Sequence, residues 1–230
     1  MKKCVTISDS HGKHDEITKD IDSGDIIFHS GDITNKGTPA QILEFLNWFG
    51  RLDFKHKIFI AGNHDFGFQP ALSAIPPIYP DIAPEFKEMG ITYLMDSMVE
   101  IDGLKIYGSP WQPRFYDWAF NLDRGEAIAQ KWALIPEGLD VLLTHGPVYG
   151  ILDDTPNGMR VGCEELYKRI AIVKPKIHIC GHIHYARGYK DFNGTSYINA
   201  SNLDERYEYR NKPISFILDD ENDLIDFNID

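Results

Sequence analysis

Five apolar segments of the sequence end in side chains that bind metals or transfer protons. These endings are Asp9-Ser10-His11, Gly31-Asp32, Gly62-Asn63-His64-Asp65, His145-Gly146 and Gly181-His182-Ile183-His184. Each follows a short run rich in Val, Ile or Phe, which is typical of a buried strand. Because the carboxyl ends of strands in α/β sheets form the sites of such proteins, we expect these five segments to meet at one edge.

The residue types at these endings favour divalent metal ions. The candidate ligands offer oxygen and nitrogen atoms and no thiolate, a set that suits Mn²⁺, Fe, Zn²⁺ or Mg²⁺. In Asp-x-His and His-x-His on an extended segment, alternate side chains share a face and can reach one site. One ion would leave several candidates without a partner, whereas two ions sharing a carboxylate would use them all. We therefore expect two divalent metal ions, held by Asp9, His11, Asp32, Asn63, His145, His182 and His184.

The elements that must position these residues alternate along the chain. Strands are expected over 4–8, 26–30, 57–62, 104–109, 139–145, 176–182, 195–201 and 214–219, and helices over 38–50, 84–89, 123–134 and 162–173. Thr38 and Gln41 have capping-box spacing at the start of one helix, and Gly50 is placed to end it. Asn193-Gly194 between two strand-like runs predicts a hairpin. The pattern predicts α/β layers with a partly antiparallel sheet.

The composition narrows the class of protein. The chain has 230 residues, 43% of them hydrophobic, which predicts a single domain over 1–230. A net charge of −12 disfavours long nucleic acid as a partner. An odd number of cysteines, three, indicates a reducing compartment and predicts a cytoplasmic protein. No apolar run reaches about 18 residues, so no membrane span is expected. The sequence leaves the oligomeric state open, and we expect a monomer or homodimer as the usual case.

The five motifs, in this order, resemble the calcineurin-like metallophosphoesterase superfamily. The segment 108–147, with 197–201, is similar to the MPPED branch, some of whose members replace one histidine of Gly-His-x-His; this chain keeps both. The resemblance implies a four-layer sandwich of two mixed β-sheets flanked by helices. It also implies a binuclear centre, most active with Mn²⁺, in which a water between the ions attacks phosphorus.

The resemblance further assigns a role to each site residue. Asp9, His11 and His184 would hold one metal, Asn63, His145 and His182 the other, and Asp32 would bridge them. His64 would face the leaving-group oxygen as a proton donor, and Asp65 would orient its other ring nitrogen. We also expect Trp111, Arg114 and Tyr116 to contact the substrate.

The resulting prediction is hydrolysis of small phosphodiesters, such as 2′,3′- or 3′,5′-cyclic nucleotides. A phosphomonoesterase or protein phosphatase with the same metals is an alternative, and a non-catalytic interaction module is another. The remaining histidines are interpreted as structural or solvated: His29 and His178 in the core, His14 and His56 in solvent. The aromatic residues over 111–120 are expected to be mostly core.

Overall fold

The computed structural model describes residues 1–69 and 83–229. Its first sheet has the strand order β14-β13-β1-β2-β3-β4. Strands β1 to β4 are parallel, and β13 and β14 add an antiparallel pair beside β1. The bounds are Lys2–Ile7 for β1, Gly24–His29 for β2, Phe54–Phe59 for β3, Ile91–Tyr93 for β4, Ile214–Leu218 for β13 and Leu224–Asn228 for β14.

The second sheet has the order β11-β12-β10-β9-β6-β5 and is likewise mixed. Strands β6, β9, β10 and β12 are parallel, and the antiparallel strands β5 and β11 form its edges. The bounds are Ser97–Ile101 for β5, Leu104–Ser109 for β6, Val141–Thr144 for β9, Ile177–Cys180 for β10, Gly188–Phe192 for β11 and Thr195–Asn199 for β12. A separate pair joins β7 (Gln112–Pro113) to β8 (Asn121–Leu122).

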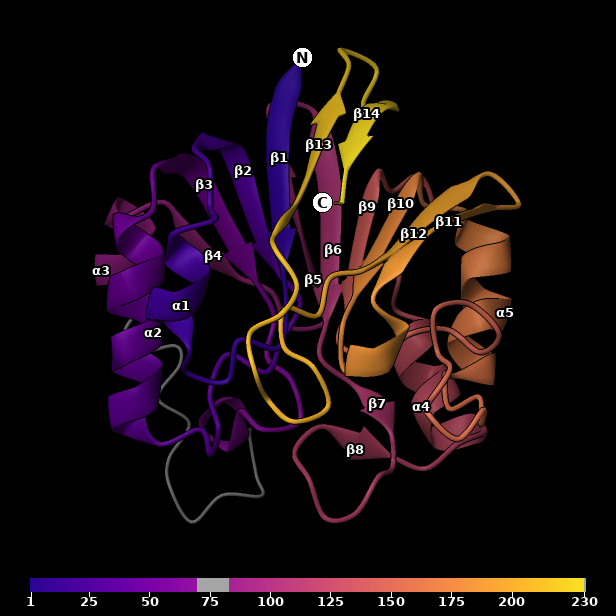
Figure 1. Ribbon diagram of the computed structural model, residues 1–230. Helices are drawn as coiled ribbons and strands as arrows, with labels where there is room; N and C mark the ends of the chain where they lie inside the picture. Colours follow the sequence, from indigo (N-terminus) through magenta and orange to yellow (C-terminus); the bar gives the residue numbers. More distant parts are fainter. Residues whose placement is uncertain (70–82, 230) are drawn as a thin grey trace.

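Helices cover the outer face of each sheet (Figure 1). Helices α1 (His14–Thr18), α2 (Pro39–Arg51) and α3 (Ala83–Glu88) lie on the side of the first sheet, and α4 (Glu126–Trp132) and α5 (Glu164–Val173) on the side of the second. Two short 3₁₀ turns, η1 (Phe66–Phe68) and η2 (His184–Ala186), follow β3 and β10. The result is the expected order of layers: helix, sheet, sheet, helix.

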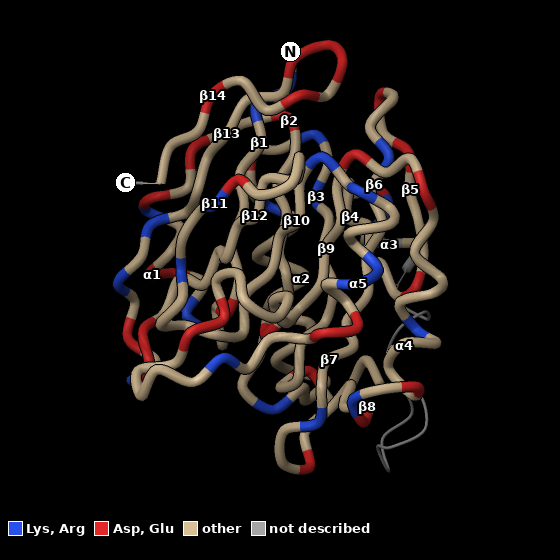
Figure 2. Tube along the Cα trace, turned by 90° about the vertical axis from the view of Figure 1, so that its right-hand side faces the viewer, with Lys and Arg blue, Asp and Glu red and all other residues tan. Residues whose placement is uncertain are grey.

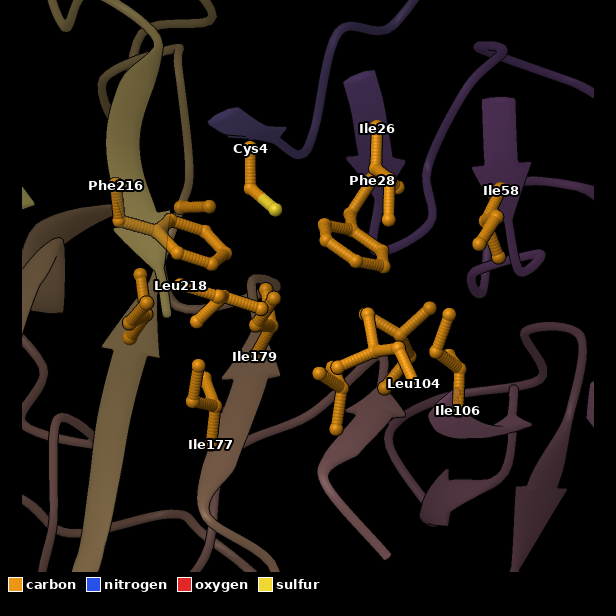
Figure 3. Packing of buried hydrophobic residues seen from close by; sticks show 14 of the residues in the cluster. Cys4, Ile26, Phe28, Ile58, Leu104, Ile106, Ile177, Ile179, Phe216 and Leu218 are labelled. Atoms are coloured by element: carbon orange, nitrogen blue, oxygen red, sulfur yellow. The ribbon is translucent and has the colours of Figure 1, made fainter. Parts of the chain in front are cut away.

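Three apolar clusters hold these layers together. The central cluster lies between the sheets, where Phe28 of β2 stacks on Phe216 of β13 at a centroid distance of 6.2 Å. Figure 3 shows this packing, with Cys4, Ile26 and Ile58 facing Leu104, Ile106 and Ile177 from the other sheet. The second cluster joins the first sheet to α2, and the third joins the second sheet to α4 and α5. Removing this much apolar surface from water is the main stabilising contribution to such a fold.

Most of the expected elements are confirmed. The Thr38–Gln41 capping box is present, and β11 and β12 form the hairpin around Asn193-Gly194. Gly50 does not end α2, which continues to Arg51. Strands β4, β5, β7 and β8 were not predicted. They are short or, like β5 with its alternating burial, lie half exposed at a sheet edge and lack a continuous apolar run.

Two predictions about single residues have different outcomes. The three cysteines are free and buried, as expected for a reduced chain. His14, expected in solvent, is buried at 4% exposure, because its ring stacks on Trp48 at 4.7 Å. His29 and His178 are buried, as expected.

Charged residues lie mainly on the outer loops and helices, with acidic and basic positions interspersed (Figure 2). The central strands β9 and β10 carry none. Among the helices of the described ranges, none has the length and apolar character that crossing a membrane requires.

Candidate metal centre

The five motifs meet at one edge of the sandwich, where β1, β2, β3, β9 and β10 end at the lower side of Figure 1. The first sheet supplies Asp9, His11, Asp32 and Asn63, and the second supplies His145, His182 and His184. All are at most intermediate in exposure, and Asp9 and His145 are fully buried. The site therefore lies at the junction of the two sheets and takes side chains from both.

Within the site, the possible ligand atoms form three overlapping groups. One ligand atom from each member lies within 4.8 Å of the others in Asp9–His11–His184, in Asp32–His145–His182 and in His11–Asp32–His64. Asp32 Oδ2 lies 3.7 Å from Nε2 of His11 and 3.3 Å from Nε2 of His145. Nε2 of His145 also lies 2.9 Å from Oδ1 of Asn63. Asp32 therefore lies between the group that contains His11 and the group that contains His145.

The backbone is specialised to bring these side chains together. Asp9, His11, Asp32 and His182 all adopt positive φ, between 43° and 66°. Such conformations are strained for residues other than glycine and are concentrated at functional sites. Gly181 packs so tightly that a Cβ there would lie 2.0 Å from Ser8 Oγ and 2.2 Å from Asp9 Oδ2. The chain therefore accepts local strain to place these groups in one cluster.

Backbone carbonyl groups fix the orientation of three histidine rings. Nδ1 of His145 lies 2.9 Å from the Ser30 carbonyl oxygen, and Nδ1 of His184 lies 2.9 Å from that of Asp204. Nδ1 of His64 lies 3.0 Å from the Asn35 carbonyl oxygen. A carbonyl accepts only from a protonated nitrogen, so each ring turns Nε2 toward the centre. The same anchoring is usual for histidines that bind metals.

The His11 ring tests whether the residues fit a metal ion. It is 3% exposed, and neither of its ring nitrogens has a hydrogen-bond partner in the described part of the chain. Buried polar groups are normally paired, and an orphaned one calls for an explanation such as an ion. A divalent cation next to His11, Asp9 and Asp32 would supply that partner, so the residues present fit the group.

The electrostatics of the site favour bound positive charge. Burial alone would raise the pKa of Asp32, but the imidazoles of His145 and His11 lower it well below its usual range. Asp9 behaves in the same way, with His184 as its main partner. Burial opposes protonation of His145, yet the Asp32 carboxylate raises the pKa of that imidazole to about 9. The two buried carboxylates thus stay ionised, because the neighbouring imidazoles compensate their negative charge. Bound metal ions can supply the same positive charge.

Asp65 does not orient His64, contrary to expectation. Its carboxylate accepts hydrogen bonds from the amides of Ile33, Thr34 and Gly62 and from the Thr34 hydroxyl, at 2.7–3.1 Å. The Asn35 carbonyl holds His64 instead. Asp65 therefore ties the loop after β2, which carries Asp32, to the loop after β3, which carries Asn63. Because Asp65 directly follows His64 in the sequence, the sequence gave no indication that the two side chains have different partners.

The three expected substrate residues are distributed unevenly. Trp111 donates from Nε1 to Asp96 at 2.9 Å and packs on Phe120. Tyr116 is 74% exposed, whereas Arg114 lines a cavity beside His182. Phe115 was expected in the core, but it is 53% exposed and lines the same cavity.

Two aromatic residues near the centre were not predicted to be functional. Trp118, expected in the core, lies against His64 with ring centroids 4.1 Å apart. Tyr207 faces His11 at 4.7 Å and His184 at 5.3 Å. Trp118 lay in an aromatic-rich segment, which is a weak signal. Tyr207 carried no signal, because its loop approaches the centre only in the folded chain.

The fold and the cluster of candidate ligands together identify the family of the protein. The model of the calcineurin-like phosphoesterase family matches residues 2–186, and the chain belongs to that family. Membership indicates a divalent-metal-dependent hydrolase of phosphoesters.

Individual relatives narrow the similarity. Metallophosphoesterase domain-containing protein 1 of Homo sapiens is 42% identical over 91% of this chain and 69% of its own length. A UPF0046 protein of Caenorhabditis elegans is 39% identical over 92% of this chain and 79% of its own. The crystal structure of phosphopantetheinyl hydrolase from Mycobacterium tuberculosis shares the fold, with a TM-score of 0.55 and 15% identity over 89% of this chain and 90% of that one.

Proposed function

We propose that the protein hydrolyses small phosphodiesters at a binuclear metal centre. The observation that supports this most is the clustering of Asp32 with six other candidate ligand residues, among which His11 is buried and has no hydrogen-bond partner in the described part of the chain. In this proposal Asp9, His11 and His184 would hold one ion, Asn63, His145 and His182 would hold the other, and the Asp32 carboxylate would serve both. Two such ions supply Lewis-acid stabilisation of the phosphoryl oxygens and lower the pKa of a coordinated water.

His64 is the proton donor in this proposal. Its Nδ1 faces the Asn35 carbonyl, so Nε2 is the nitrogen available to the leaving-group oxygen. Its ring lies 4.6 Å from that of His11, which places it at the rim of the centre. His64 acts in its doubly protonated form, because its Nδ1 already donates to the Asn35 carbonyl. As the oxygen of the attacking water bonds to phosphorus and the bond from phosphorus to the leaving oxygen breaks, that oxygen gains the proton on Nε2, and the ring is left neutral.

A diester is favoured over a monoester by the charge of the chain and by the pairing of its arginines near the site. The net charge is −12, and the two arginines that line the cavity beside His182, Arg114 and Arg124, are already paired with Asp123 and Glu164. A monoester dianion places more negative charge here than a diester monoanion. Within the diesters we favour cyclic nucleotides, with Mn²⁺ as the ion that best supports turnover. We include in the proposal a single domain, a monomeric or dimeric state and a cytoplasmic location.

The test combines metal content with turnover. We expect two Mn²⁺ per chain and faster hydrolysis of bis-p-nitrophenyl phosphate than of p-nitrophenyl phosphate. Asp32→Asn should lose metal and activity together, because Asp32 contacts both ligand sets. The matched control is Asp154→Asn, a partly exposed carboxylate that pairs with Arg160 and is not among the candidate ligands.

Each other outcome supports a different function. Preference for the monoester would indicate a phosphomonoesterase or protein phosphatase. Metal binding without turnover of either ester would indicate an interaction module. Full activity in Asp32→Asn would refute the shared-carboxylate centre.

A further inference from the structure

A cavity of about 260 Å³ opens beside the metal centre on the side of His182. Its apolar walls come from three parts of the chain that are distant in sequence. Pro113 ends β7 and Phe115 follows it, Pro147 follows β9, and Ile183 follows β10. This size is slightly below that of most small-molecule sites, and it suits one planar ring system and not a large ligand.

The wall that carries Phe115 is held in place independently of that side chain. The side chain of Asn121, in β8, accepts from the amide of Phe115 and donates to the carbonyls of Phe115 and Tyr116, at 2.9–3.3 Å. The amide of Ala119 donates to the Asn63 carbonyl at 3.0 Å. The loop over 114–120 is therefore fixed at its base and braced against a candidate ligand segment, which makes Phe115 a preorganised contact.

The opposite wall is also ordered. Arg124, one of the lining residues, donates to the carbonyls of Val161 and Gly162, both at 2.8 Å. The buried Asp153 accepts from the amides of Gly150 and Gly162 at 2.9 and 3.0 Å. Both walls are thus anchored by buried or multiply bonded polar groups, so the cavity does not depend on a ligand for its shape.

The cavity lies on the side of the centre away from His64. The Phe115 ring lies 6.3 Å from the ring of His182, which groups with Asp32 and His145. His64 groups instead with His11 and Asp32. Since His64 faces the leaving oxygen in the proposed reaction, the other ester oxygen of an acyclic phosphodiester carries its substituent, the one that is retained, toward His182.

The chemistry of the walls selects the occupant. Phe115 is a large apolar side chain left 53% exposed, and exposed apolar groups that line a cavity mark a binding surface. Arg114 uses Nε for Asp123 at 2.6 Å, so its terminal nitrogens are available at the cavity rim to an acceptor atom of a ligand. An aromatic ring that carries a hydrogen-bond acceptor satisfies both features.

We propose that this cavity binds the retained substituent of the phosphodiester and that this substituent is a planar aromatic ring system, with Phe115 as the residue that selects it. This inference rests on the proposed function for the orientation of the substrate. Nucleobases have both the aromatic ring and the acceptor, and simple aryl groups have the aromatic ring that contacts Phe115.

The experiment measures binding as well as turnover. Phenylphosphonate and methylphosphonate, which have no bond that the enzyme hydrolyses, are titrated into the Mn²⁺-loaded full chain by calorimetry. We expect phenylphosphonate to bind about tenfold more tightly, the gain of one aromatic contact. Phe115→Ala should reduce this preference to about twofold without changing methylphosphonate affinity. Phe192→Ala, at an exposed phenylalanine of β11, is the matched control and should keep it.

The same variants are then assayed on phenyl and methyl p-nitrophenyl phosphate, which share a leaving group. A phenyl preference that depends on Phe115 supports the inference; if it appears in binding but nothing is hydrolysed, the cavity assignment holds and the proposed function fails. Turnover without any phenyl preference overturns the inference and leaves the function intact. No phosphonate binding, or a preference that persists in Phe115→Ala, also overturns it.

Discussion

The indole of Trp118 lies against the imidazole of His64, with ring centroids 4.1 Å apart and planes tilted by 40°. On its other side, His64 is held through Nδ1 by the Asn35 carbonyl. The candidate proton donor is thus fixed by two groups, neither of which is its neighbour in sequence. A general acid needs this kind of positioning, because the proton must lie within hydrogen-bond reach of the leaving oxygen.

His64→Ala should lower kcat for a chromogenic diester by about 10²–10⁴-fold while two metal ions per chain are retained. The reason is that His64 contributes a proton and is not among the seven proposed ligands. Metal analysis and steady-state kinetics on the same sample check this. Unchanged kcat would remove His64 from the mechanism.

Trp118→Ala should lower kcat by less, about tenfold, because the indole positions His64 without exchanging a proton. Trp118→Phe, which keeps a ring at this place, should recover most of the loss. A pH profile separates this role from a general loss of structure: in Trp118→Ala its acidic and basic limbs should move, and in Trp118→Phe they should return. Identical profiles for all three proteins would contradict the positioning role.

Asp65→Asn should destabilise the fold by about 3 kcal/mol, since an amide nitrogen would replace an acceptor facing two buried donors. Ile33 and Gly62 both donate to Oδ2 of Asp65, and Thr34 donates twice to Oδ1. Urea unfolding of the metal-free protein measures this. Asp154→Asn, at a partly exposed site, should change the unfolding free energy by less than about 0.5 kcal/mol. Equal values for the two variants would show that Asp65 does not tie the loops together.

Gly181→Ala should abolish binding of at least one metal ion. The added methyl group would lie 2.2 Å from Asp9 Oδ2 and displace that carboxylate. Gly146→Ala is the matched control: it follows His145, and its nearest neighbour would be at an ordinary 3.7 Å. Metal analysis should therefore separate the two variants, and full occupancy in Gly181→Ala would show that Asp9 is dispensable.

His178 should make the metal-free protein less stable in acid. Burial lowers the pKa of its imidazole to about 3, whereas the unfolded chain takes up that proton near 6.5. Stability from this residue is complete above 6.5 and is lost as the pH falls from there toward 3. Between pH 7.5 and 5.5 the unfolding free energy of the wild type should fall by about 1.4 kcal/mol more than that of His178→Gln. Parallel curves would indicate that His178 is protonated in the folded state.

The clustering of these candidate ligands could be predicted from the sequence because each motif is local. In a motif such as Gly-Asp or Gly-Asn-His-Asp after a strand, the glycine indicates where the chain turns. The next residue is then the candidate ligand at the end of that strand. Strands that pack in parallel then bring the endings together without further specification. This is why Asp32 and His145, 113 positions apart, were predicted to share a site.

The residues that line the cavity beside His182 could not be predicted in the same way. Tyr116 was expected to contact substrate and Phe115 to be core, yet Tyr116 has a left-handed backbone with φ of 51° and is the more exposed of the two. The orientation of the loop depends on hydrogen bonds from Asn121. Asp65 gives the same lesson, since its partners belong to a different loop. Such contacts depend on tertiary structure and cannot be predicted from neighbouring residues in the sequence.

The position of the centre between the two sheets has a consequence for how the molecule assembles. The amide of His182 donates to the carboxylate of Asp9, 173 positions earlier, at 3.0 Å. Contacts of such sequence separation form late, because the loop between them must close first. A chain with only its first sheet in place holds Asp9, His11, Asp32 and Asn63 but none of the three histidines from the second sheet. Metal capture would then be among the final events of folding and would resist separation of the sheets, so that metal occupancy would report whether the two sheets had come together.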